Sequence, residues 1–410
     1  MTEAVANAPA RPMSIFANPH FRNLWIGGSI SALGDQFYLV ALPWLVLQLT
    51  GSNLAVGTVL MCAAIPRAVL MLAGGAISDR IAPRSIMLRT ASTRTIFVAL
   101  VGVLAWFHVV QLWHLYVLAS AFGIADAFGL PAFQKIIPSL VERDQLSSAN
   151  AAFQSMYQLA TMIGPAPAGM LIKALNIAWA FLIDAFSFLF ILAPIYALPR
   201  TAPEPKPRVE GKHFGHDILD GLQFVWRDPP LRGLTIVLAG VNLCVAGPII
   251  VGPAALGKFV FHSPAAFGVL ISCWSAGAVI GSIFSGVRKQ QTHRGWTIII
   301  LSSLVSLGIG SVGLMSSEPA MGAVLALAGV CGGYNNIVLI SWVQGRVEPA
   351  FMGRVMSVLM FGWIGLMPIS YPVAGALAQW SIRGMFVISG LTGAVLTMLC
   401  AIRPDLRHVQ

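Results

Sequence analysis

Residues 75–84 read Gly75-Ala-Ile-Ser-Asp79-Arg80-Ile-Ala-Pro-Arg84. This short charged segment joins two long apolar runs, residues 53–77 and 85–107. A helix needs about 20 predominantly apolar residues to cross a bilayer, and each run is long enough. The segment therefore predicts a tight turn in water between two membrane-spanning helices.

The same pattern of apolar runs continues along the whole chain. The runs are continuous and of helix length, unlike the alternating strands of outer-membrane barrels. We therefore expect an all-α membrane protein whose twelve transmembrane helices span approximately residues 21–49, 53–77, 85–107, 112–138, 147–173, 177–198, 231–257, 264–288, 296–316, 319–344, 353–379 and 383–402.

The composition excludes most soluble classes of protein. Hydrophobic residues make up 57% of the 410 residues and charged residues only 10%, against about 25% charged in an average globular chain. The five cysteines lie in or beside apolar stretches without metal-ligand spacing, so neither a disulfide scaffold nor a metal site is expected. The sequence also has no nucleophile elbow, HExxH motif or phosphate-binding loop, which disfavours a membrane enzyme and an ATP-driven pump.

The net charge of +10 is distributed unevenly between the two sides of the membrane. One side collects most Lys and Arg, while the other holds only Lys173, Lys258 and Arg383. Cytoplasmic loops carry the positive excess, which places both termini in the cytoplasm, most simply of a bacterial inner membrane. Anionic lipid accounts for this charge, so nucleic acid is not expected as a partner.

Residues 199–230 form the one long connection, between two groups of six predicted helices. We expect segments at 1–20 (cytoplasmic), 21–198 (first bundle), 199–230 (linker), 231–402 (second bundle) and 403–410 (cytoplasmic tail). Residues 201–208 are rich in proline and charge, which is typical of a linker. Ile218, Leu222, Val225 and Trp226 then fall at helical spacing and predict a short amphipathic helix on the membrane surface. A solvated linker without a helix is the alternative.

The two groups of helices repeat each other in sequence. Ser52-Asn-Leu-Ala-Val-Gly57 matches Ser263-Pro-Ala-Ala-Phe-Gly268, and Ala168-Gly169 matches Ala374-Gly375. Two further pairs, at residues 18–22 with 228–232 and at 141–142 with 347–348, follow in the same order at a nearly constant offset. This repeat predicts two pseudo-symmetric six-helix bundles, the architecture of a secondary transporter with its site between the halves.

The charged segment at 75–84 resembles the G-x-x-x-D-R-x-G-R-R motif of the major facilitator superfamily. Gly75, Asp79, Arg80 and Arg84 match this motif, while Ala82 and Pro83 replace its inner Gly and one Arg. The fifth predicted helix resembles the antiporter motif G-x-x-x-G-P-x-x-G-G of the same superfamily through Gly164, Pro165, Pro167 and Gly169, with Ala at two motif glycines. Gly34-Asp35 and Ile183-Asp184 resemble the drug:proton antiporter branch with macrolide-efflux and enterobactin-exporter proteins.

Each motif has two interpretations. The cluster at Asp79 can hold the two halves together in one state, or it can be a turn anchor with ordinary cytoplasmic positive charge. The small residues and prolines at 164–169 either bend the fifth helix for function or serve simple packing.

Ionisable residues deep in the predicted spans are the strongest candidates for function. Charges in the bilayer are expensive and are retained mainly where they face a cavity or a partner. Asp35, Arg67 and Asp126 lie near the middle of their spans. We interpret Asp184 as a structural residue. Arg94 is expected to be able to extend its side chain to the membrane surface. We expect Arg67 to pair with Asp35 or Asp126, leaving the other carboxylate without a cation to exchange protons, with Asp35 preferred. A permanent ion pair that only fixes packing is the alternative.

Aromatic and amide side chains suit a cavity for an amphipathic ligand. The expected cavity residues are Phe37, Tyr38, Phe122, Phe128, Gln154, Tyr157, Gln158, Asn242, Tyr334, Asn335, Asn336, Trp363 and Tyr371.

The resemblance implies a monomeric, proton-driven exporter of an amphipathic drug, macrolide or siderophore that works by alternating access. It uses the proton gradient as its energy source and no cofactor, and its partners are protons, membrane lipid and the substrate. A lysophospholipid flippase of the same fold, which also carries a Gly-Asp pair in its first helix, is the alternative.

Overall fold

A computed structural model describes residues 14–78, 81–198, 222–287 and 294–401, and these residues are helical with no strand. The first half contains α1 (Pro19–Thr50), α2 (Asn53–Ser78), α3 (Pro83–Trp106), α4 (Leu112–Ile136), α5 (Leu146–Ile163), α6 (Pro165–Ala174) and α7 (Ile177–Ala197). The second half contains α9 (Pro229–Ala255), α10 (Pro264–Val287), α11 (Arg294–Val312), α12 (Glu318–Arg346), α13 (Pro349–Ile364), α14 (Met367–Trp380) and α15 (Ile382–Ala401). The all-α prediction is confirmed.

Two of the twelve predicted spans are each built from two helices. The fifth span breaks between α5 and α6 at Gly164, because Pro165 has no backbone N–H to continue the hydrogen-bond ladder. The eleventh span breaks between α13 and α14 at Gly365 and Leu366. Eleven segments of the described chain are long and apolar enough to cross a membrane, and the α5–α6 pair supplies the twelfth span.

Local signals explain where the first helix starts and stops. The Asn18 side chain accepts a hydrogen bond from the His20 amide (2.9 Å), and it donates another to the Leu140 carbonyl (2.7 Å). It therefore caps α1 and ties its start to the turn that follows α4. Gly51 ends α1 with a φ of 63°, a backbone conformation that glycine adopts without a Cβ clash.

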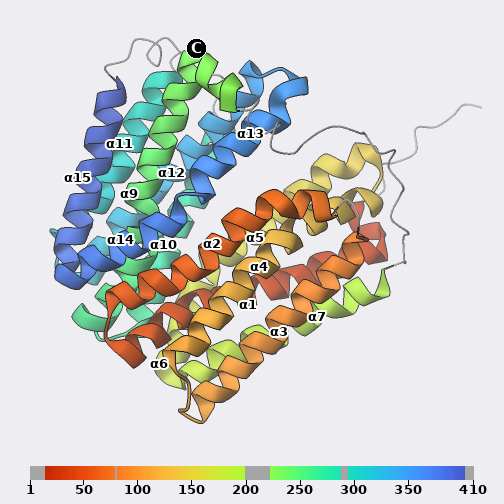
Figure 1. Cartoon of the computed structure of the whole chain (residues 1–410), viewed down its shortest axis with the longest axis horizontal. Coiled ribbons are helices and arrows are strands. Elements are labelled where there is room, and N and C mark those ends of the chain that lie inside the picture. Colours follow the sequence, from red (N-terminus) through yellow and green to blue (C-terminus); the bar gives the residue numbers. More distant parts are fainter. Residues whose placement is uncertain (1–13, 79–80, 199–221, 288–293, 402–410) are drawn as a thin grey trace, which may run out of the picture.

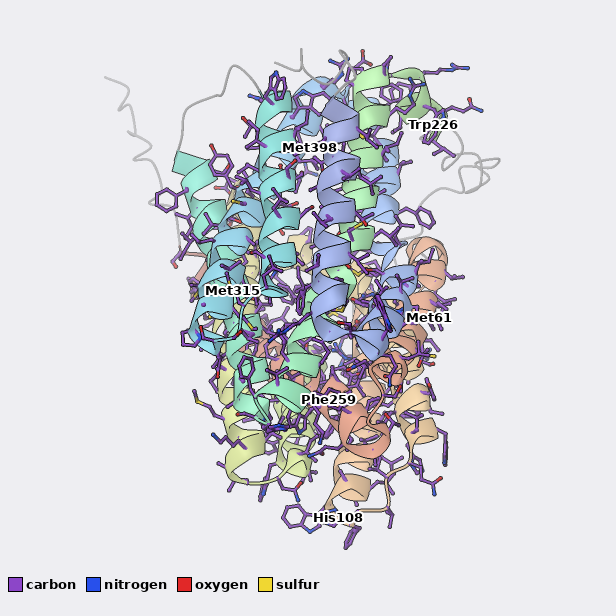
Figure 2. All side chains as sticks on the ribbon, turned by 90° about the vertical axis from the view of Figure 1, so that its left-hand side faces the viewer. Met61, His108, Trp226, Phe259, Met315 and Met398 are labelled. Atoms are coloured by element: carbon purple, nitrogen blue, oxygen red, sulfur yellow. The ribbon has the colours of Figure 1, made fainter. Side chains whose placement is uncertain are left out.

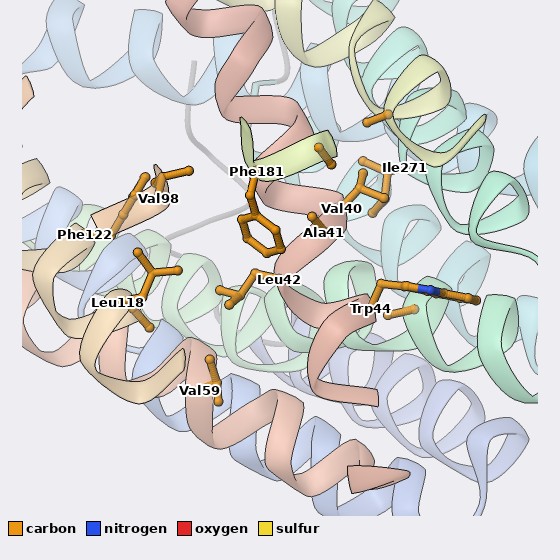
Figure 3. Packing of buried hydrophobic residues seen from close by; sticks show 14 of the residues in the cluster. Val40, Ala41, Leu42, Trp44, Val59, Val98, Leu118, Phe122, Phe181 and Ile271 are labelled. Carbon is orange, nitrogen blue, oxygen red and sulfur yellow. The ribbon is translucent and has the colours of Figure 1, made fainter. Parts of the chain in front are cut away.

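The helices pack as two bundles that lie at an angle to each other (Figure 1). In the first bundle α1 and α3 pack against α7, and α2 packs against α4; in the second, α10 packs against α12, and α11 against α15. Figure 3 shows the core of the first bundle, where Phe122 and Leu118 of α4 lie close to Val98 of α3, with Phe181 of α7 nearby. This core fixes the positions of the four helices that carry the intramembrane charges.

The two bundles contact each other near one end of the molecule. There the Asn53 amide N–H donates to Gln379 Oε1 (2.8 Å), and the Ala166 amide N–H donates to Ser272 Oγ (3.1 Å). We call this the closed end. From it the bundles diverge toward the opposite end (Figure 1), and Figure 2 shows His108 and Trp226 at opposite extremes of the molecule.

The contact between the bundles has the symmetry that the sequence repeat predicts. α14 packs against α2, and α6 packs against α10. Gly57 of α2 lies against the backbone of Tyr371, while its repeat partner Gly268 of α10 lies against the backbone of Pro165. Each half therefore presents an equivalent glycine to the broken helix of the other half.

The linker prediction can be compared with the structure only in part, since residues 199–221 lie outside the described residues. Residues 222–227 are helical, and Val225 is fully buried in the core of the second bundle. Phe224 stacks on Phe351 of α13 with ring centroids 5.1 Å apart. This short helix therefore packs on the second bundle, while Leu222 and Trp226 remain exposed.

Candidate functional site

Four charged side chains from four helices of the first bundle form one cluster in the middle of the predicted spans. Arg94 of α3 donates a hydrogen bond to Asp35 Oδ1 of α1 over 2.6 Å. Asp126 of α4 lies 3.6 Å from Arg94 Nη1 and 3.6 Å from Arg67 Nη1 of α2. We call these residues the ion cluster. It is a chain of alternating charges, which lowers the cost of placing each ion in the membrane.

Aromatic rings enclose the guanidinium of Arg94. Its Cζ lies 4.3 Å from the ring centroid of Phe122 and 4.8 Å from that of Phe188. Tyr38 stacks on Phe122 with centroids 4.1 Å apart and planes nearly parallel, 8° apart. Cation–π contacts of this kind are strongest where water is excluded. The rings therefore hold Arg94 in place between Asp35 and Asp126.

The expected pairing of Arg67 is confirmed, but the reason for preferring Asp35 as proton exchanger is wrong. Arg67 contacts Asp126, as the sequence allowed. Asp35, however, is not left without a cation, because Arg94 binds it. The interpretation of Arg94 as extending to the membrane surface is also wrong. The position of Arg94 along its span could have indicated this. Arg94 lies 11 residues after Pro83, or about 16 Å along α3, and is therefore close to the bilayer centre.

The ion cluster faces the space between the two bundles. The side chains of Asp35 and Arg94 are 26% and 20% exposed, and those of Arg67 and Asp126 are each 33% exposed. From the second bundle, Met367 places its sulfur 3.8 Å from an Arg67 guanidinium nitrogen. The cluster is thus accessible to a ligand and touches both halves.

Two expected cavity tyrosines lie beside this cluster. Tyr371 of α14 donates to the Met367 sulfur (3.6 Å) and interacts electrostatically with Arg67. Tyr157 of α5 interacts electrostatically with all four charges of the cluster, and it is exposed. Together with Tyr38 they surround the charges with aromatic surface, which suits an amphipathic organic ligand.

Other expected cavity residues make contacts elsewhere. Asn335 donates to Ser302 Oγ (3.1 Å), and Asn242 donates to the carbonyl of Leu238 (3.1 Å), so both amides are bonded within the second bundle. The Trp363 side chain lies outside the described residues. Of the remaining expected residues, Gln154 is exposed, and the others are half-buried: Phe37, Phe128, Gln158, Tyr334 and Asn336.

The structure describes only the two ends of the predicted gating loop. Gly75 lies within α2, Asp79 and Arg80 lie outside the described residues, and Arg84 opens α3. Arg84 donates to the carbonyl oxygens of Ile195 (3.1 Å) and Tyr196 (2.6 Å) at the end of α7. These are contacts within the first bundle, at the last turn of α7, where the Ile195 carbonyl also accepts from the Leu198 amide N–H (3.2 Å).

The antiporter-like motif lies at the contact between the bundles. Gly169 lies against the backbone of Pro264, and Gly164 lies against the side chain of Gln36. Pro165 begins α6, and Pro167 follows it as an exposed residue of the first turn. The motif therefore lies where the fifth span breaks, and it packs that span closely against α10.

A cavity of about 670 Å³ lies away from the ion cluster, at the closed end. Its lining includes Trp44, Lys173 and His108 of the first half with His262 of the second. Lys258 lies over the Trp44 ring at 5.5 Å and links the halves there. The cavity is thus part of the contact between the bundles, and the ion cluster remains the candidate site.

Comparisons with known proteins agree with this architecture. The enterobactin exporter EntS of Escherichia coli strain K12 is 27% identical over 407 residues, which cover 96% of this chain and 94% of that protein. The Shigella boydii serotype 18 exporter of the same name is 27% identical over 396 residues, 93% of each chain. A crystal structure of the nucleoside transporter NupG carrying D323A superposes with a TM-score of 0.77 at 11% identity, over 93% of this chain and 99% of that one, which shows the same fold.

The family comparison covers nearly the whole chain. Residues 10–409 match the family described as "Transmembrane secretion effector" (MFS_3). The family and the similar exporters are transporters, and the membrane-length helices make this chain an integral membrane protein. The chain belongs to the transmembrane secretion effector family of the major facilitator superfamily.

Proposed function

We propose that this chain exports an amphipathic organic molecule in exchange for protons, by alternating access. The observation that carries the proposal is the ion cluster, whose carboxylates and guanidiniums are partly exposed between the two halves. Secondary transporters of this architecture bind substrate and coupling ion near the bilayer midplane, between their halves. Partly exposed carboxylates at that position can exchange protons with the cavity.

The arrangement of the halves supports the alternating-access part of the proposal. The halves are joined at the closed end and diverge toward the end at which α7 finishes and residues 222–227 begin. The distribution of Lys and Arg supports a cytoplasmic position for that diverging end. The structure then corresponds to the state that loads substrate from the cytoplasm. Opening the closed end would release the substrate on the opposite side.

The surroundings of the cluster favour an aromatic substrate with polar or anionic groups. Arg67 offers a partly exposed guanidinium, and Tyr157 and Met367 offer apolar surface near it. A siderophore has this chemistry, and the similar Escherichia coli protein is named an enterobactin exporter. We therefore place a siderophore first among the substrates, before a macrolide or another drug.

Transport by the purified monomer in proteoliposomes tests this function. An imposed pH gradient should drive accumulation of radiolabelled enterobactin or macrolide, and a protonophore should abolish that accumulation. Accumulation that survives the protonophore would exclude proton coupling. Movement of fluorescent lysophospholipid between leaflets, with none of the siderophore or macrolide, would instead identify a lipid flippase.

A further inference from the structure

One intramembrane carboxylate remains outside the ion cluster. Asp184 of α7 is fully buried, and neither of its carboxylate oxygens has a hydrogen-bond partner among the described residues. The nearby Ser187 hydroxyl donates to the backbone carbonyl of Asp184 (2.7 Å), and it also lies close enough to the carboxylate to interact with it. An ionised carboxylate that is buried without donor or cation is very costly, whereas the protonated acid is not.

Asp184 lies directly behind the ion cluster. A Cβ atom on Gly34, the residue before Asp35, would lie 2.9 Å from Asp184 Oδ1, so the carboxylate is in contact with the α1 backbone. Asp184 interacts electrostatically with Asp35 and Arg94. Asp35 and Arg94 are partly exposed toward the cavity, while Asp184 is not. The three side chains thus lead from the cavity to a closed site.

The other ionisable groups around Asp184 come from the helices that pack with α7 and from their neighbours. α1 contributes Tyr38 besides Asp35, α3 contributes Arg94, and the cluster continues to Asp126 and Arg67. The Tyr38 hydroxyl is buried without a partner and interacts electrostatically with Asp184 and Asp35. The ionisable residue of α6, Lys173, lines the cavity at the closed end instead.

The charges of this region do not balance without a proton. Three carboxylates, Asp35, Asp126 and Asp184, stand against two guanidiniums, those of Arg67 and Arg94. Asp35 and Asp126 each contact a guanidinium, and Asp184 contacts neither. One proton makes the group neutral, and Asp184 is the member without a cation to hold its charge.

We propose that Asp184 is a buried proton-binding site and that Arg94 controls the release of the proton. The site is occupied while the halves diverge at the end nearest residue 222. This rests on the proposed function. When the Arg94 guanidinium turns from Asp35 to Asp184, the O–H bond of Asp184 breaks and Asp35 takes the proton. Asp35 then passes the proton to water in the cavity. One proton is exchanged in each cycle, and Arg94 is a positioning residue that alternates between the two carboxylates.

Infrared difference spectroscopy on the purified protein in lipid nanodiscs tests the site without any substrate. Wild type at neutral pH should show the C=O stretching band of a protonated carboxyl group. Asp184→Asn should remove that band, and Asp126→Asn, which leaves Arg94 paired with Asp35, should retain it. A band that persists in Asp184→Asn, or that disappears only in Asp35→Asn, would overturn the proposal. Should Asp184→Asn not fold, Asp184→Glu, which keeps an acid at the site, should shift the frequency of the band, and an unshifted band would overturn the proposal.

Transport by the same variants tests the coupling. Asp184→Asn copies the neutral, protonated acid, so substrate counterflow should continue while gradient-driven accumulation falls about tenfold or more. Leu189→Ala, which changes an exposed residue of α7, should behave like wild type. Full gradient-driven accumulation by Asp184→Asn would refute the proposal. Absence of gradient-driven transport in wild type would instead refute the proposed function. The infrared experiment would still decide whether Asp184 binds a proton.

Discussion

Arg94 and Asp35 form a short ion pair, with 2.6 Å between a guanidinium nitrogen and Oδ1, and they join the third and first spans. The side chains are only 20% and 26% exposed. Removing one partner of such a pair leaves an uncompensated charge in the membrane. The pair therefore links α1 to α3, which both pack against α7, and it contributes to the electrostatics of the cavity.

Replacing Arg94 should destabilise the protein strongly. Arg94→Ala leaves Asp35 without its cation and removes one of the two cations of Asp126, so we expect a loss of about 3 to 5 kcal/mol and no measurable transport. Arg94→Lys should recover only part of the stability, because an ammonium group cannot contact both carboxylates in the same planar geometry. Thermal unfolding in detergent measures both effects.

A double-mutant cycle separates the pair from its surroundings. Adding Asp35→Asn to Arg94→Ala removes the charge that the single variant leaves buried, so the double variant should unfold at a higher temperature than Arg94→Ala alone. Equal unfolding temperatures would mean that Asp35 does not depend on Arg94 for its charge balance.

Arg67 should matter more for substrate than for stability. Its contact with Asp126 is long, at 3.6 Å, and both side chains are one-third exposed, so the pair contributes at most about 1 kcal/mol. Arg67→Ala should therefore leave the unfolding temperature nearly unchanged. Substrate counterflow should need about tenfold more substrate for half-maximal rate, because a cavity cation is lost. Unchanged counterflow would show that Arg67 is not part of the substrate site. Arg67→Lys, which keeps the positive charge, is the control.

Arg84 provides a test of the turn-anchor interpretation. Its two hydrogen bonds to the last carbonyls of α7 tie the start of α3 to the end of the sixth span. Arg84→Gln should lower the stability by about 1 to 3 kcal/mol, since charged hydrogen bonds of this kind contribute that much. Chemical denaturation followed by tryptophan fluorescence measures the difference. Wild-type stability in this variant would show that the carbonyls are satisfied without Arg84.

The sequence was sufficient to predict depth along each span but not the direction in which side chains point. Apolar runs place Asp35, Arg67 and Asp126 near the middle of the membrane, and Pro165 predicts a break, because these properties depend on local sequence. Which carboxylate receives Arg94 depends on the rotation of α1 against α3 and α4. A uniformly apolar surface leaves that rotation undetermined, since lipid and protein interior are similar solvents.

For the same reason, the sequence could not predict that Asp184 has no contacting cation. Its position in an apolar span was visible, but the absence of a partner is a property of the packed structure. The repeat was more informative, because Gly57 with Gly268 and Gly169 with Gly375 could be paired from sequence alone. Their contacts across the two halves depend on which helices meet, and no sequence spacing indicates that.

These repeated glycines should control opening of the closed end. A Cβ on Gly268 would overlap the carbonyl oxygen of Pro165, and a Cβ on Gly57 would overlap that of Tyr371. Gly268→Ala or Gly57→Ala should therefore cost about 1 to 3 kcal/mol of contact between the halves and shift the population toward a separated closed end. Gly286→Ala in the same helix as Gly268 is the matched control, because a Cβ there meets nothing within 4 Å. Spin-label distances across the closed end should increase in the first two variants and stay at the wild-type value in the control. An equal distance in all four proteins would show that the halves are not held together at these glycines.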